Sequence, residues 1–171
     1  MYRNPAPNPL QPNLPLIHHH QCLPVGVQEL AHIHDFSAEG RTWSFLRFHQ
    51  KLILLIHFRQ YSEGNTQHGY FQREFPLEFL GWFPGAVAQY ERCPGTECES
   101  IIGDECLKLQ PSDVGRRYCA VLNYSRCQRG YSPVTDFRPQ ETIIAHHFLH
   151  QGGLLALIKE MARHYLPAQP E

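Results

Sequence analysis

The sequence predicts an α+β fold in which one structural plan occurs twice, as two β-β-β(-β)-α repeats. Two observations support this prediction. In each half, segments rich in aromatic and β-branched residues precede a single amphipathic helical segment, and apolar residues alternate along the strand candidates. The halves share few identities, so what repeats is element order and hydrophobic period. We therefore expect antiparallel sheets packed on two amphipathic helices.

The 171-residue chain is expected to form one domain between a proline-rich arm and a short tail. Residues 1–28 are read as an extended arm outside the core, because its prolines remove backbone donors and favour polyproline II. Residues 29–167 form the α+β domain, duplicated at about 35–92 and 107–167. Residues 168–171 are the tail.

Three strands are predicted in the first half. Thr42–Phe48 and Lys51–Gln60 alternate apolar and polar residues, and Tyr70–Phe75 continues the sheet. Ser62–Gly69 is rich in turn-forming residues and is predicted to be a loop.

The second half opens with a polar bridge, predicted over Glu91–Glu105. Arg117–Cys127 follows as a strongly alternating strand, and Ser132–Phe137 as a shorter one. Thr142–His150 alternates as a strand does, although a helix that begins near Gln140 is an alternative interpretation.

Each half is predicted to end in a helix. Leu77–Glu91 carries apolar residues at helical spacing, but Pro84 and Gly85 should kink or split this helix. Gly152–Leu166 has a continuous apolar stripe opposite charged residues, and Pro167 follows its end.

Charge and composition narrow the function classes. A formal net charge of -1 argues against coating duplex DNA by charge alone, so any nucleic-acid role needs local patches and stacking. No apolar run reaches the roughly 20 residues of a membrane helix, so we expect no membrane partner and a cytoplasmic location. Without a secretory signal, the six cysteines are read mostly as thiols.

Two groups of residues suggest metal ligation. Gly26, His32, His34 and Glu39 resemble the first metal-binding motif of the cupin family, in which two histidines and a glutamate hold a divalent ion. The second group consists of three loop cysteines, Cys93, Cys98 and Cys106, whose spacing fits no common zinc module. Ordinary surface histidines and thiols explain both groups, so we predict no cofactor.

Catalytic motifs are missing from the sequence. It contains no G-x-S-x-G elbow, no P-loop and no glycine-rich dinucleotide turn, which favours a protein that is not an enzyme. Sheet faces that bind single strands combine aromatic platforms for bases with cations for phosphates. The candidate residues of this kind are Arg41, Trp43, Lys51, His57, Arg59, Arg73, Arg117, Tyr124 and Arg126.

The duplicated plan resembles the Whirly class of single-stranded nucleic-acid-binding proteins, over residues 35–167. The stretch from Glu39 to Phe45 is similar to the Whirly Lys-Gly-Lys-Ala-Ala-Leu-Ser signature at Gly40 and Arg41, whereas Glu39 replaces a lysine. The resemblance implies a helix-packed core, outward-facing sheets, homo-oligomers and non-enzymatic binding of single-stranded DNA or RNA.

Two alternatives compete with single-strand binding. A regulatory adaptor would use protein–protein contacts and bind no nucleic acid, with Leu154, Ile158 and Met161 or the exposed aromatic residues as its interface. A small cupin-like, metal-dependent enzyme would use His32, His34 and Glu39.

Overall fold

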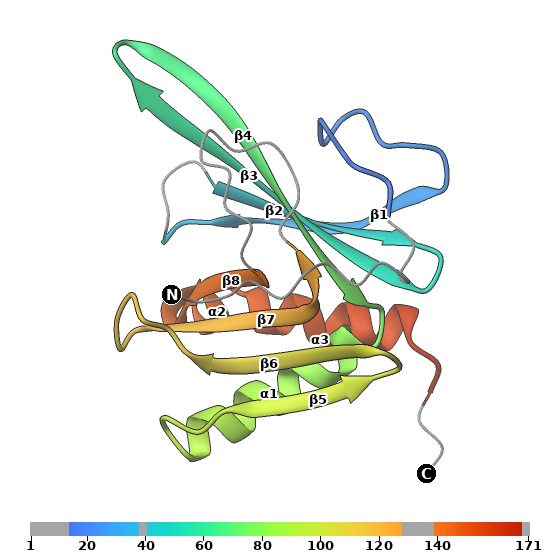
Figure 1. The fold of residues 1–171 in the computed structure, drawn as a ribbon, viewed down its shortest axis with the longest axis vertical. Helices are drawn as coiled ribbons and strands as arrows, with labels where there is room; N and C mark the ends of the chain where they lie inside the picture. The colour runs from blue at the N-terminus through green and yellow to red at the C-terminus, as the bar shows by residue number, and fades with distance from the viewer. Residues whose placement is uncertain (1–13, 38–40, 128–138, 169–171) are drawn as a thin grey trace.

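The computed structural model of the chain describes residues 14–37, 41–127 and 139–168. It contains two four-stranded antiparallel sheets, each in sequential strand order, and three helices. The predicted α+β fold of two sheet-and-helix units is confirmed. Figure 1 shows β5 to β7 crossing in front of α1 and α3, with β1 to β4 above them.

The first sheet has the order β1-β2-β3-β4. Its strands are β1 (Val27–Asp35), β2 (Arg41–Phe48), β3 (Lys51–Ser62) and β4 (Asn65–Pro76). Because β4 begins at Asn65, the predicted loop over Ser62–Gly69 is wrong for most of its length: the turn is tight, with positive φ at Glu63 and Gly64. Its polar residues extend a long hairpin that projects beyond the rest of the molecule (Figure 1).

The second sheet has the order β5-β6-β7-β8. Its strands are β5 (Cys98–Ile102), β6 (Glu105–Pro111), β7 (Tyr118–Cys127) and β8 (Pro139–Ala145). The predicted polar bridge over Glu91–Glu105 is therefore wrong, since it contains all of β5: a five-residue edge strand with one apolar face gives only a weak sequence signal. The strand predicted at Ser132–Phe137 lies outside the described residues.

The helices are α1 (Phe79–Arg92), α2 (His146–His150) and α3 (Leu154–Tyr165). α1 continues through Pro84 and is not split there. In the stretch Thr142–His150, β8 ends at Ala145 and α2 follows from His146. The stretch is therefore neither one strand nor a helix that begins near Gln140, and both interpretations are wrong. Apolar and polar residues continue to alternate into α2. The sequence pattern therefore does not distinguish strand from helix at this point, and tertiary packing decides between them.

One main core joins both halves. α1 packs against α3, and the inner faces of both sheets contribute to the same cluster. Its fully buried large side chains include Trp43, Phe45, Phe75, Phe83 and Phe148. Burial of this apolar surface, at roughly 25 cal/mol per Å², is the main force that holds the two units together.

A second, smaller core lies on the outer face of the first sheet. Leu14 and Ile17 are 5% and 1% exposed and pack on Leu46, Ile53 and Leu55. The prediction that residues 1–28 lie outside the core is thus wrong for these two residues. Gln72 fixes the segment, because its Oε1 accepts a 3.0 Å hydrogen bond from the backbone N–H of Ile17.

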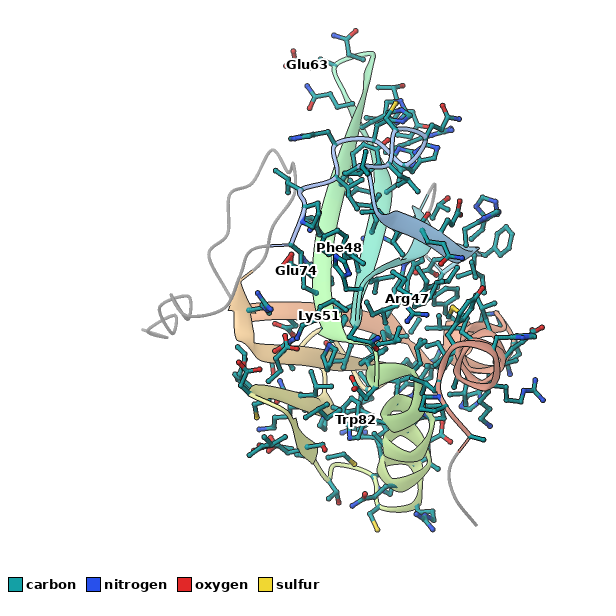
Figure 2. All side chains as sticks on the ribbon, turned by 90° about the vertical axis from the view of Figure 1, so that its right-hand side faces the viewer. Arg47, Phe48, Lys51, Glu63, Glu74 and Trp82 are labelled. Atoms are coloured by element: carbon teal, nitrogen blue, oxygen red, sulfur yellow. The ribbon has the colours of Figure 1, made fainter. Side chains whose placement is uncertain are left out.

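A buried polar network connects the two sheets. Lys51 Nζ lies 2.7 Å from Glu105 Oε2, and Arg126 Nε donates to Glu105 Oε1 at 3.0 Å. Asn123 Nδ2 donates to the backbone oxygen of Glu74 at 2.8 Å. Figure 2 shows Lys51 and Glu74 at the base of the β3–β4 hairpin, beside the second sheet, with Glu63 at its far tip.

Among the described residues, no helix is long and apolar enough to cross a membrane.

Candidate functional site

A histidine-lined pocket occupies part of the outer face of the first sheet, beside the small core. Its volume is about 750 Å³. The segment before β1 and the strands β1, β2 and β3 supply the lining residues, which are His20, Gln21, Leu23, Glu29, His32, His34, Thr42, Ser44, His57 and Arg59.

Strand register explains why these side chains meet. His34 pairs with Thr42, Thr42 with His57, and His57 with Tyr70, so one row of residues crosses all four strands. Residues that pair directly across antiparallel strands point to the same face of the sheet. Arg59 follows His57 by two positions and therefore extends the same face.

Aromatic rings form a stack at one side of the pocket. The His57 ring lies 4.9 Å from that of Tyr70, 5.2 Å from that of His68 and 5.4 Å from that of His20, centroid to centroid. A hydrogen bond of 2.9 Å joins His57 Nε2 to His68 Nδ1, and another of 3.1 Å joins His20 Nδ1 to the Tyr70 hydroxyl. These bonds hold the rings in fixed orientations.

The protonation of His57 follows from these surroundings. Burial, followed by the charges of His20, His68, Arg59 and His19, lowers the pKa of His57 to about 4. At pH 7 this imidazole is neutral, so it offers a flat ring rather than a charge. Arg59, which is exposed at the pocket rim, carries the positive charge there.

The predicted nucleic-acid-binding residues do not form one surface. His57 and Arg59 line the outer pocket, whereas Arg41 and Arg73 line a different cavity on the inner side of the same sheet. The exposed Arg117 lies just before β7, and Tyr124 lies within it.

Three of the predicted residues, Trp43, Arg73 and Arg126, have little exposed surface, and a fourth, Lys51, is partly buried. Trp43 is 2% exposed in the main core and cannot stack on a base, because its strand position faces the helices. Arg126, 7% exposed, and Lys51 are both paired with Glu105. Arg73 is 6% exposed. The alternation of apolar and polar residues showed which side chains share a face of each strand. It did not show which of the two faces the helices cover.

Those metal-ligand candidates that the structure describes do not form a metal-binding cluster. His32 Nδ1 lies 3.0 Å from Glu29 Oε1, His34 Nδ1 lies 3.0 Å from Thr42 Oγ1, and Glu39 lies outside the described residues. Within the described part of the chain, no group of three or more histidine, cysteine, aspartate or glutamate side chains is placed to hold a metal ion.

The loop cysteines are free thiols in different surroundings. Cys93 is exposed, Cys98 is buried and its Sγ lies 3.4 Å from the Ala86 carbonyl oxygen, and Cys106 lies beside Glu99. For the adaptor hypothesis, Leu154, Ile158 and Met161 are buried in the main core, so their predicted role as an interface is wrong.

Sequence reasoning missed the contribution of the N-terminal segment and the hairpin to the pocket. His20 belongs to the segment predicted to be an arm outside the core, and His68 to the segment predicted to be a loop. Tyr70 and His57 pair across β3 and β4, and that register could have been proposed from a tight turn at Glu63 and Gly64. Nothing in the sequence places His20 against His57.

Comparison of the chain with protein-family models, curated proteins and solved structures gave no significant match. The resemblance to the Whirly class therefore stays a prediction.

Proposed function

We propose that this protein binds single-stranded nucleic acid without catalysis, at the histidine-lined pocket of the first sheet. The observation that carries the proposal is the stack of His57 with Tyr70, His68 and His20 beside Arg59. Nucleobases stack on flat aromatic rings whatever their sequence, and a neighbouring cation neutralises the phosphate.

The pocket has a suitable volume for such a ligand. Its 750 Å³ lie within the roughly 300–1,000 Å³ of typical small-ligand sites, enough for one or two nucleotides rather than a long tract. Neutral His57 supplies the stacking surface at pH 7, and Arg59 supplies the charge. Glu29 is the one carboxylate among the residues that line the pocket, and it lies 3.0 Å from His32.

The test is a fluorescence-anisotropy titration of the full chain with labelled single-stranded and double-stranded oligonucleotides at two salt concentrations. We expect tighter binding of the single strand and a Kd that rises with salt. The His57→Ala variant loses a stacked ring. Its Kd should be roughly tenfold higher or more, because base–aromatic stacking contributes about 1–3 kcal/mol per base.

Arg59→Gln separates the charge from the stacking. This variant should weaken binding and reduce the salt slope by about one unit, since one phosphate contact is lost. Arg92→Gln is the matched control. Arg92 is exposed at the end of α1, a helix that contributes no lining residue to this pocket. Equal losses in both variants, or a Kd insensitive to salt, would contradict the proposal.

A protein-binding adaptor is the second candidate, and one observation favours it. A mainly apolar groove of about 470 Å³ lies between α1 and α3, lined by Leu80, Gly81, Pro84, Ala156, Lys159, Ala162 and Arg163. An absence of oligonucleotide binding at low salt would favour this candidate over the first.

A further inference from the structure

The inner side of the first sheet contains a cavity that the proposed function does not use. It has a volume of about 180 Å³, room for about six waters at roughly 30 Å³ each. It lies where β4 and β8, the edge strands of the two sheets, contact each other. The lining residues are Arg41, Ile56, Phe71, Arg73, Glu141, Thr142 and Ile143.

Arg73 is an unusual residue for such a position. Its side chain is 6% exposed, yet its Nε and Nη1 atoms have no hydrogen-bond partner among the described residues. The Glu141 carboxylate acts on this guanidinium as an opposite charge, but it leaves these two nitrogen atoms without hydrogen bonds. Buried donors without a hydrogen-bond partner are costly, so such groups are normally paired. Burial, followed by the charge of Arg41, lowers the pKa of Arg73 to about 10, which still leaves the guanidinium charged at pH 7.

Packing holds the Arg73 guanidinium in place without using its donors. Its Cζ atom lies 4.9 Å from the centre of the Phe71 ring, and Phe71 is itself stacked on Phe58 at 4.7 Å. Gly69 makes room for this arrangement, because a Cβ there would lie 2.1 Å from Phe58 Cζ. A contact of the guanidinium with an aromatic ring uses none of its N–H donors, so Nε and Nη1 of Arg73 can donate to a ligand.

A second unpartnered group lines the same cavity. Thr142 is 2% exposed, and its Oγ1 has no hydrogen-bond partner among the described residues. Arg41 adds a second positive charge, while Glu141 contributes one carboxylate. Two guanidinium groups against one carboxylate leave the cavity net positive, with several free donors.

We propose that this cavity binds a small tetrahedral oxyanion, namely inorganic phosphate or a phosphate monoester group. Planar guanidinium donors match phosphate oxygens in geometry, and a threonine hydroxyl adds a further donor. The ligand would supply the partners that Arg73 and Thr142 lack and would stabilise the contact between β4 and β8.

The test measures the melting temperature of the full chain in inorganic phosphate and in potassium chloride of equal ionic strength. We expect phosphate to raise Tm by about 5 °C or more once its concentration exceeds Kd about a hundredfold. Arg73→Met, similar in length but neutral, should abolish the increase. Arg116→Met is the matched control, since Arg116 is exposed before β7 and should leave the increase unchanged.

Two further results decide the proposal if Arg73→Met behaves unexpectedly. The nearly isosteric Thr142→Val should raise the apparent Kd for phosphate several-fold. In the unmodified chain, phosphate should shift the Nε–Hε NMR signal of Arg73 and not that of Arg116.

The proposal is overturned if phosphate stabilises Arg73→Met as much as the parent, or if the Arg73 signal does not respond. It is also overturned if Arg73→Met without phosphate melts more than about 5 °C below the parent, because the guanidinium would then already be paired within the chain. Because this cavity and the histidine-lined pocket lie on opposite faces of the first sheet, either result leaves the nucleic-acid proposal standing.

Discussion

The two sheets have the same strand order but very different outer faces. On the first sheet, Leu14 and Ile17 cover Leu46, Ile53 and Leu55, and histidines line the pocket beside this small core. On the second sheet, Ile101 is 73% exposed and Tyr124 is 37% exposed. The residues on the inner faces must pack in a shared core, whereas those on the outer faces need not. Two sheets with the same strand order can therefore have different outer surfaces.

The side chains on the two outer faces also differ in their partners. Lys108, in the second sheet, pairs with Glu97 and lies 5.9 Å from the centre of the Tyr124 ring. The charge of Arg59 in the first sheet faces histidine rings instead. We therefore expect ligand binding at the first sheet and mainly local stabilisation at the second.

Matched isoleucine truncations should show the largest difference. Ile17→Ala removes a side chain that is 1% exposed and should lower the free energy of unfolding by about 2–4 kcal/mol. Ile101→Ala, at a largely exposed position of the second sheet, should change it by less than about 0.5 kcal/mol. Urea denaturation measures both, and equal effects would show that the N-terminal segment is not docked as described.

A change in pH should affect the first sheet through His57. Its pKa in the folded chain, about 4, is below the ordinary value of 6.5, so the unfolded chain binds more protons between these pH values. Stability is therefore complete above pH 6.5 and declines as the pH falls towards 4. The slope should be only a fraction of 1.36 kcal/mol per pH unit, because the ring is partly solvated.

Urea midpoints at pH 7 and pH 5 test this dependence. His57→Gln should have a smaller difference between the two midpoints than the parent. An unchanged difference would assign the pH dependence to other groups.

Tyr124→Ala should have a small effect, because this ring is partly exposed and its cation–π contact with Lys108 is solvated. We expect a loss of about 0.5–1 kcal/mol in urea denaturation. The oligonucleotide Kd should hardly change if binding is confined to the first sheet. A loss as large as that of Arg59→Gln would instead extend the interface to the second sheet, in line with the sequence prediction for Tyr124 and Arg117.

Hydrophobic period predicted the strands and helices that are long and have one clearly apolar side. Lys51–Gln60 lies within β3, and Arg117–Cys127 begins one residue before β7 and ends with it. The last helix was placed within two residues at its start and one at its end. Strands β1, β5 and β6 and the outer half of the β3–β4 hairpin were missed. Five residues, as in β5, or a polar ladder, as in the hairpin, produce little periodic signal.

The candidate sites were predicted less well than the fold. Arg59 and His57 were chosen for their residue type and strand position, and both line the pocket, but Trp43 was chosen on the same grounds and is buried. A strand pattern shows which residues share a face. It does not show what covers that face, since the covering segment can come from anywhere in the chain.

By itself, the order of residues settled the double succession of strands and helix, because backbone periodicity acts over a few neighbouring positions. Only the folded chain decided that Ile17 packs on one sheet and that His20 contacts His57. It also decided that Nε and Nη1 of Arg73 have no hydrogen-bond partner in the part of the chain that the structure describes. These outcomes depend on contacts between residues far apart in sequence, and such contacts leave no periodic trace in either segment alone.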